Sequence, residues 1–134
     1  LCGHASSGQA AKACNNMLLA TTMIGVGEAF NLGENLGLDL KKLFDVLSTS
    51  TGNCWAINTY CPIEGVGPNS PADNNFQPGF SGNLMLKDLT IALKAIKHTN
   101  TSAPFGTKSQ ENFKRMINDN KGELDFSAIV NFNK

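Results

Sequence analysis

Apolar residues recur at helical spacing along most of this chain. Between Gly8 and about Leu36 they occupy nearly every face of one long helix, a pattern that predicts a central helix buried on most sides. Shorter stripes at three- and four-residue spacing predict helices over 39–47 and 84–97, with Leu84 on the inward face. No run alternates with a period of two for long enough to form a strand. The pattern therefore predicts an all-α fold around one long central helix.

Capping residues mark where other helices begin. Asp39 suits the N-cap of the second helix, Pro104 the first turn of a helix that runs to about residue 120, and Asp125 the cap of a last short helix. A short helix over 54–60 places the only tryptophan close to the only tyrosine. Between these helices, 62–82 is rich in proline and glycine and predicts an irregular loop. Such a loop in a compact domain usually serves a site or a subunit contact.

The middle of the long helix combines glycines with many apolar side chains. Gly25 and Gly27 lower helix stability, so they predict close approach by another element. A helix that is hydrophobic all round is covered by its own domain or by a partner chain. This part of the sequence therefore favours a homo-oligomer.

Composition and charge restrict the function classes. The chain has 134 residues, of which 41% are hydrophobic and 16% charged, as expected for one folded domain. Eleven basic residues offset eleven acidic ones, so the net charge is +0. Without a basic face, nucleic acid and membrane surfaces are not expected partners. The longest apolar uncharged stretch, 17–27, is shorter than the ~20 residues that cross a bilayer.

The first residues and the cysteines bear on location. The chain begins at Leu1, with neither the basic flank nor the apolar run of a signal peptide, and we expect a fragment whose upstream part is absent. The four cysteines form no CxxC pair, and with His4 and His98 they do not reach zinc-site spacing, so no metal is predicted. We expect buried, reduced thiols at Cys2, Cys14, Cys54 and Cys61. A reducing compartment, either a bacterial cytoplasm or a mitochondrial matrix, follows.

The candidate chemistry begins with a lysine inside the long helix. Gly8, Lys12 and Asn16 are spaced by four residues, which aligns them along one stripe. If that stripe borders a cleft, low-dielectric surroundings would favour the neutral amine that general acid/base catalysis needs, and the amide could hold a substrate hydroxyl or carboxylate. A solvated lysine beside a polar interface patch remains the alternative.

A second candidate, Lys87 with Asp88, follows the irregular loop. A lysine there could meet an anionic or ribose-bearing ligand, with the aspartate orienting it, whereas an exposed charge pair is the plainer interpretation. Phe80 suits a core position as well as a ligand contact. The sequence has no GxGxxG after a strand, no GxSxG, no P-loop and no HExxH. Any dinucleotide would therefore be shared with chain that is not here.

Four stretches, 8–19, 28–39, 52–62 and 79–89, together resemble the C-terminal domain of the β-hydroxyacid dehydrogenases. The third stretch, with its Cys-Trp and Thr-Tyr pairs before a proline, resembles the 3-hydroxyisobutyrate subgroup. The resemblance implies an all-α domain, similar to the C-terminal domain of 6-phosphogluconate dehydrogenase. It also implies a separate N-terminal Rossmann domain and NAD as cofactor, with NADP left open. The reaction implied is oxidation of 3-hydroxyisobutyrate to methylmalonate semialdehyde in valine catabolism.

The resemblance also implies roles for individual residues. Lys12 matches the catalytic lysine, which takes the proton from the substrate hydroxyl during oxidation and returns it during reduction. Asn16 matches the asparagine that positions the substrate, and Lys87 the lysine at the nicotinamide end of the cofactor. Phe80 and Asp88 match residues that line the substrate site. Where the family has Gly-x-Gly before the lysine, Ser6 replaces the first glycine.

Two alternatives remain open at this point. A tartronate semialdehyde or glyoxylate reductase of the same family would use the same lysine in the reducing direction. A stand-alone helical interaction module would keep the fold without catalysis. The isolated 134 residues are expected to be inactive in either enzyme interpretation, because the cofactor half is not among them.

Overall fold

The computed structural model describes residues 7–132. The described chain is helical, and its only sheet-like pairing is an isolated bridge between Ser81 and Asp125. The predicted all-α class is confirmed. The elements are α1 (Ser7–Asn35), α2 (Leu40–Thr49), α3 (Trp55–Asn58), the 3₁₀ helix η1 (Pro71–Asn74), α4 (Gly82–Thr99), α5 (Pro104–Asn118) and the 3₁₀ helix η2 (Phe126–Phe132).

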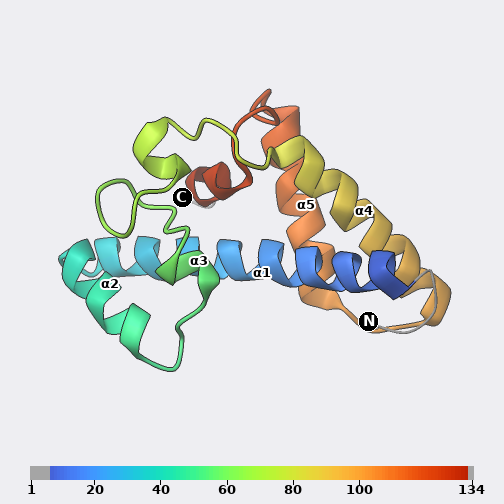
Figure 1. Cartoon of the computed structure of the whole chain (residues 1–134), viewed down its shortest axis with the longest axis horizontal. Helices are drawn as coiled ribbons and strands as arrows, with labels where there is room; N and C mark the ends of the chain where they lie inside the picture. The colour runs from blue at the N-terminus through green and yellow to red at the C-terminus, as the bar shows by residue number, and fades with distance from the viewer. Residues whose placement is uncertain (1–6, 133–134) are drawn as a thin grey trace.

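The long helix α1 is the axis of the fold. It runs across the molecule in Figure 1, and it contacts α2, α3, α4, α5 and η2. The helices α4 and α5 lie against each other and cross α1 towards its N-terminal half, whereas α2 folds back at its other end. The central position predicted for this helix is confirmed.

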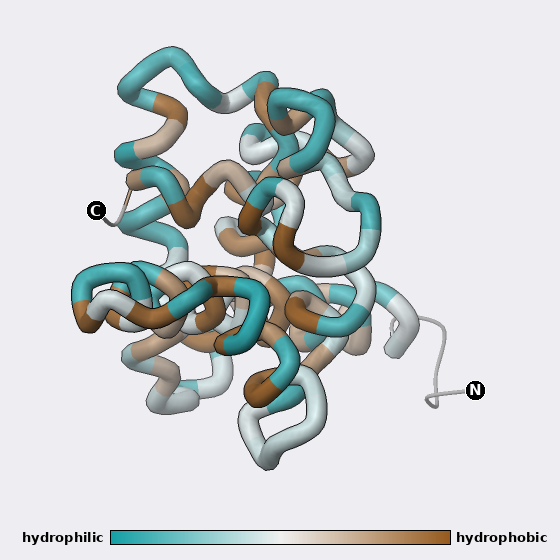
Figure 2. The backbone as a smooth tube through the Cα atoms, turned by 90° about the vertical axis from the view of Figure 1, so that its left-hand side faces the viewer, coloured by the Kyte–Doolittle hydropathy of each residue, from teal (hydrophilic) through white to brown (hydrophobic). Residues whose placement is uncertain are grey.

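The core gathers where these elements meet α1. Figure 2 shows hydrophilic residues mainly on the outer turns and hydrophobic segments towards the middle of the molecule. The largest fully buried apolar side chains are Met23, Phe30, Met85, Leu89, Phe113, Met116, Phe126, Ile129 and Val130. Burial of this apolar surface supplies the main driving force for the fold.

Within residues 7–132 alone, α1 is not buried on most sides, and the alternative of cover by a partner chain stays a prediction. Eight of its residues are buried against the neighbouring elements, among them Gly33 against Leu43 of α2, whereas Leu18 and Leu32 are 65% and 60% exposed. Cys14, in the N-terminal half of the helix, is also exposed. The helices α2 and α3 also contact α1 but leave these leucines largely exposed, so an apolar pattern all round the helix overstated its burial within one chain.

The two glycines in the middle of α1 have different surroundings. At Gly27 a Cβ atom would lie 2.5 Å from Cγ1 of Val130, so the predicted close approach is confirmed and the partner is η2. At Gly25 a Cβ would meet nothing within 4 Å, so there the prediction is wrong. Only one of the two glycines is required by packing.

The helix ends follow local rules. Asp39 caps α2 by accepting a hydrogen bond from the Lys42 N–H at 3.0 Å, and Pro104 occupies the first turn of α5, both as predicted. The chain leaves α1 through Gly37, whose φ of 78° is readily adopted by glycine. Leu84 is 48% exposed, so its predicted inward orientation is wrong; it lies in the first turn of α4, outside the buried face.

The irregular segment between α3 and α4 is held by a buried carboxylate. Asp125 is fully buried, and its Oδ2 accepts hydrogen bonds from the Tyr60 hydroxyl at 2.9 Å and from the N–H groups of Gly79 and Phe80 at 3.0 and 3.1 Å. Its Oδ1 accepts from the N–H and the hydroxyl of Ser127 at 3.0 and 2.6 Å. Asp125 therefore caps η2, as predicted, and also fastens the end of the loop that leads into α4.

The cysteines are free thiols with different exposure. Cys61 is buried, Cys54 is intermediate, and burial raises the pKa of the Cys61 thiol. Cys14 is exposed and contradicts the predicted burial, because no neighbouring element of the described chain covers its side chain. Cys2 and His4 lie outside the described residues. Within 7–132 no three His, Cys, Asp or Glu side chains gather as a metal site would require.

Candidate active site

Two helices bring three of the predicted site residues together. Lys12 and Asn16 lie one turn apart on α1, and Asp88 lies on α4. The amide Nδ2 of Asn16 donates a hydrogen bond to Oδ2 of Asp88 at 2.6 Å, and the Lys12 amine lies 3.3 Å from the same oxygen. One carboxylate oxygen thus holds the stripe on α1 against α4, although 72 positions separate Asn16 from Asp88.

The three residues of this cluster differ strongly in how far their side chains are exposed. Asn16 and Asp88 are buried, with 9% and 8% exposure, whereas the Lys12 side chain is 65% exposed. Lys12 lies in the second turn of α1, where α4 packs against one side of the helix. The predicted low-dielectric enclosure of the amine is therefore not present in the described chain. The amine is nevertheless anchored, because its ion-pair partner is itself fixed by Asn16.

The cluster borders a cavity of about 290 Å³ between α1 and α4. Lys12, Lys87 and Asp88 line it together with Gln9, Ala13 and Ile91. Two lysines face one aspartate, so the lining carries a formal excess of positive charge. Such a lining favours a small anion, for example the carboxylate of a hydroxy acid.

The N-terminal end of α4 is fixed in a way that sets the position of Lys87 and Asp88. Ser81 is the N-cap, and its hydroxyl accepts a hydrogen bond from the Leu84 N–H at 3.3 Å. The N–H of Gly82 donates to the Leu124 carbonyl at 2.8 Å. These contacts satisfy backbone groups that a helix start leaves without partners. The register of α4 against α1 therefore depends on the C-terminal segment.

Phe80 lies apart from this cavity. Its ring packs edge-on against Phe126, with centroids 6.0 Å apart, and it does not line the space between Lys12 and Lys87. Ser6, the residue in place of the family glycine, lies outside the described residues. The structure thus brings Lys12, Asn16, Lys87 and Asp88 together and leaves Phe80 in an aromatic cluster.

Three cavity residues were not predicted. Gln9 lies three residues before Lys12, and Ala13 directly after it. Ile91 lies four residues after Lys87, one turn along α4. The three- and four-residue helical spacing that aligned Lys12 with Asn16 could have found Gln9 and Ile91 as well.

The family of this chain is shown by a model described as "NAD-binding of NADP-dependent 3-hydroxyisobutyrate dehydrogenase", which matches residues 6–133. The chain belongs to this family. The predicted resemblance is thereby confirmed. Within the 3-hydroxyisobutyrate dehydrogenase family, the chain corresponds to the C-terminal part of the relatives.

Two curated relatives illustrate the similarity. The chain is 50% identical over 129 residues to a probable 3-hydroxyisobutyrate dehydrogenase of Mycobacterium tuberculosis, covering 96% of this chain and 44% of that protein. It is 44% identical over 131 residues to the mitochondrial 3-hydroxyisobutyrate dehydrogenase of Homo sapiens, covering 98% of this chain and 39% of that protein. The chain therefore spans less than half the length of these relatives.

Solved structures agree in fold. The Mycobacterium tuberculosis 3-hydroxyisobutyrate dehydrogenase, solved with L-serine, superposes with a TM-score of 0.95 at 48% identity, over 99% of this chain and 45% of that one. A 3-hydroxyisobutyrate dehydrogenase from Salmonella typhimurium gives a TM-score of 0.79 at 22% identity, over 93% of this chain and 41% of that one, a likeness of fold alone. None of the helices in 7–132 has the length and apolar character needed to cross a membrane.

Proposed function

We propose that residues 1–134 form the helical substrate and oligomerisation domain of an NAD-dependent 3-hydroxyisobutyrate dehydrogenase, which oxidises 3-hydroxyisobutyrate to methylmalonate semialdehyde in valine breakdown. One observation carries the proposal. Lys12 and Asn16 on α1 are both bound to one oxygen of Asp88 on α4, at the edge of a cavity with excess positive charge. Family membership and the match to a dehydrogenase structure support the same function.

Each residue of the cluster has a distinct role in this proposal. In its neutral form, the Lys12 amine takes the proton from the substrate hydroxyl during oxidation and returns it during reduction. Asn16 positions the substrate beside it. Asp88 lines the site and holds the Lys12 amine and the Asn16 amide in place. It does not bind the substrate carboxylate itself, because two negative charges would repel each other. Phe80 stays a predicted substrate-site residue on the resemblance alone, since its ring packs on Phe126 outside the cavity.

The cavity fits one end of a dinucleotide rather than the whole of it. At about 290 Å³ it lies just below the ~300–1,000 Å³ range of ligand pockets. Lys87 lies on its lining, where an amine suits the nicotinamide end of the cofactor. The nicotinamide ring supplies the hydride acceptor when it is bound. We place the remainder of the cofactor on a Rossmann domain outside these 134 residues, with its pyrophosphate at a helix N-terminus.

The test is a chimera that supplies the rest of the protein. The 134 residues are joined to the preceding part of the Mycobacterium tuberculosis relative and assayed with 3-hydroxyisobutyrate and NAD. We expect turnover by the chimera and none by the 134 residues alone. Lys12→Gln should lower kcat by about 10²- to 10⁴-fold, the usual contribution of general acid/base catalysis.

A matched control is Lys94→Gln, because Lys94 is an exposed lysine of α4 away from the Lys12 cavity. It should leave kcat within about twofold, since surface changes distant from the site have small effects. A folded chimera that keeps its activity after Lys12→Gln would contradict the assignment. Higher kcat/KM with glycerate or glycolate than with 3-hydroxyisobutyrate would assign the chain to the reductases of the same family.

We propose in addition that the protein is a homo-oligomer of a bacterial cytoplasm or a mitochondrial matrix. The exposed leucines of α1, with Leu18 at 65% and Leu32 at 60%, support a second copy on the uncovered side of the helix. Sedimentation velocity of the chimera would show a dimer or larger species. A monomer at micromolar concentration would contradict this part of the proposal.

A further inference from the structure

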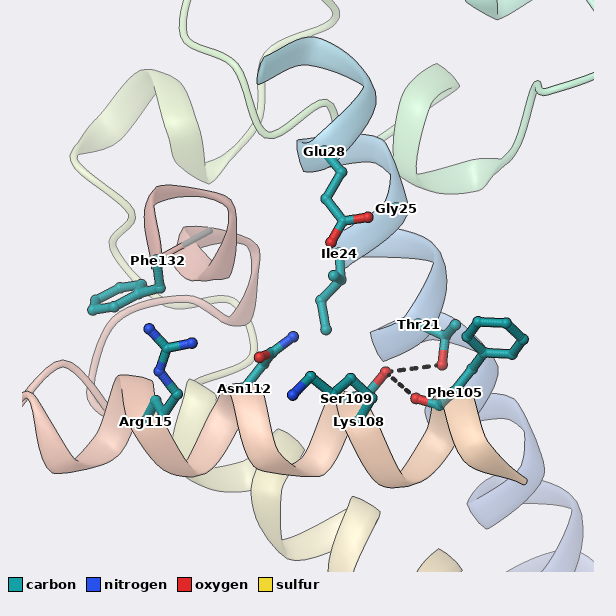
Figure 3. A pocket seen from close by; sticks show the side chains of 10 residues that line it. All are labelled: Thr21, Ile24, Gly25, Glu28, Phe105, Lys108, Ser109, Asn112, Arg115 and Phe132. Atoms are coloured by element: carbon teal, nitrogen blue, oxygen red, sulfur yellow. Dashed lines mark hydrogen bonds between the residues drawn. The ribbon is translucent and has the colours of Figure 1, made fainter. Parts of the chain in front are cut away.

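A second, larger cavity lies away from the Lys12 cluster. It has a volume of about 630 Å³ and is lined by residues of α1, α5 and η2. It shares no lining residue with the cavity at Lys12 and Lys87. Figure 3 shows the side chains of α5 pointing up into it, with α1 behind them and Phe132 at one side.

Two charges of opposite sign line this cavity without an ion-pair partner in the described part of the chain. Glu28 reaches it from α1, and Arg115 from α5. The ion pairs within residues 7–132 are Lys12 with Asp88 and Lys108 with Glu111, so among these residues neither Glu28 nor Arg115 has an ion-pair partner. A carboxylate and a guanidinium that face one space without meeting leave room for a molecule bearing both charges.

A buried amide points into the same space. Asn112 is only 8% exposed, and its side chain lies between Arg115 and Ser109 in Figure 3. Within residues 7–132 its side-chain amide makes no hydrogen bond, and its polar atoms are accessible from the cavity rather than enclosed. Buried side-chain amides normally have a hydrogen-bond partner. An amide with both an acceptor and a donor, placed beside a guanidinium, is suited to bind a carboxylate that completes its hydrogen bonds.

The remaining wall gives the cavity a fixed, partly apolar character. The hydroxyls of Thr21 on α1 and Ser109 on α5 are hydrogen bonded at 3.0 Å, which ties the two helices together (Figure 3). Ile24 and Phe105 add apolar surface, and the ring of Phe105 is 75% exposed. An exposed aromatic ring beside a polar cavity is available to cover an apolar side chain of a ligand.

We propose that this cavity binds a free α-amino acid with an apolar side chain, as a second site distinct from the dehydrogenase centre. The carboxylate binds Arg115 in the bidentate manner that a guanidinium favours and also meets the Asn112 amide. The ammonium group binds Glu28. The side chain lies against Ile24 and Phe105.

The test is isothermal titration of the chain with L-leucine, compared with two analogues that each lack one charge. Isocaproate keeps the carboxylate without the amine, and isoamylamine keeps the amine without the carboxylate. We expect saturable binding of L-leucine. Each analogue should bind with a Kd at least about tenfold higher, because it lacks one charge-assisted contact. Equal affinity for L-leucine and isocaproate would overturn the proposal.

Variants locate the site. Arg115→Gln and Glu28→Gln each change an exposed residue and should raise the Kd for L-leucine about tenfold or more. Lys114→Gln is the matched control, because Lys114 is the exposed neighbour of Arg115 on α5 and does not line the cavity. It should leave the Kd unchanged, as should Lys12→Gln in the other cavity.

Three outcomes would overturn the proposal independently of the dehydrogenase function. The first is the absence of saturable L-leucine binding by a chain whose thermal melt shows it to be folded. The second is an equal effect of Arg115→Gln and Lys114→Gln. The third is loss of binding in Lys12→Gln, which would place the amino acid at the dehydrogenase site instead.

Discussion

Asp125 and Asp88 are both buried carboxylates, yet they are satisfied in different ways. Asp125 is fully buried. It accepts five hydrogen bonds, from Tyr60 just after α3, from Gly79 and Phe80 in the loop before α4, and from Ser127 in η2. Asp88 receives one hydrogen bond from Asn16 and one ion pair from Lys12, whose side chain is 65% exposed. The first network is closed within the chain, whereas the second ends in an amine at the edge of a cavity. The network around Asp125 therefore has a structural role, and the network around Asp88 is the candidate functional one.

The strongest test of this contrast is removal of the closed network. Asp125→Ala should lower the free energy of unfolding by about 3–5 kcal/mol, because it leaves several buried donors without an acceptor. Chemical denaturation followed by circular dichroism would measure the loss. Asp125→Asn keeps an acceptor oxygen and should be less destabilising. A loss below about 1 kcal/mol for the alanine variant would show that water replaces the carboxylate and that the network is not closed.

The corresponding change in the open network should affect activity more than folding. Asp88→Asn in the chimera should lower kcat/KM by about 100-fold, since a small displacement of Lys12 is costly to a reaction that depends on its position. The free energy of unfolding should fall by about 1 kcal/mol or less, because the ion pair has an exposed partner. Glu111→Gln, which breaks the exposed pair with Lys108, is the control and should change neither quantity. A large loss of stability with full activity would reverse the contrast.

The smallest expected effect is a shift in one titration. Burial, followed by the hydrogen bond to Asp125, raises the pKa of Tyr60 above its ordinary value of 10.0. A raised pKa in the folded state means that this contribution to stability is complete below pH 10.0 and is lost as the pH rises further. Tyr60 is the only tyrosine, so the ultraviolet absorbance of tyrosinate reports it alone.

In that experiment the folded chain should show little tyrosinate at pH 10.0, whereas the chain in denaturant should be about half ionised. Asp125→Asn should shift the folded titration towards the ordinary value, because it removes a negative charge beside the phenol. Identical curves for the folded and denatured chain would mean that Tyr60 is not held in the closed network.

The sequence predicted elements better than it predicted exposure. The helix starts at Asp39 and Pro104 were confirmed, because N-cap side chains and proline act over a single turn. Burial around α1 was wrong at Cys14, because a stripe pattern records which side chains are apolar and not whether another element covers them. The orientation of Leu84 was wrong for the same reason, since the first turn of a helix extends beyond the elements that pack on it.

The candidate site was predictable where its residues share a helix. Lys12 and Asn16 are one turn apart, so helical spacing alone placed them together. Their meeting with Asp88 depends on how α4 crosses α1, which no local pattern specifies, and resemblance to a family was needed to join them. Three of the five donors around Asp125 come from segments 45 to 65 residues away, and only the two local donors of Ser127, which belong to its capping role for η2, could be predicted in advance.

The close contact between Gly27 and Val130 makes the middle of the long helix and the C-terminal segment interdependent in evolution. Position 27 has no space for even a methyl group while valine occupies position 130. A larger residue at the first position is therefore compatible with this packing only when the second becomes smaller. The side chain at position 130 fits the space that the glycine leaves on α1. Positions 27 and 130 are therefore expected to vary together across lineages.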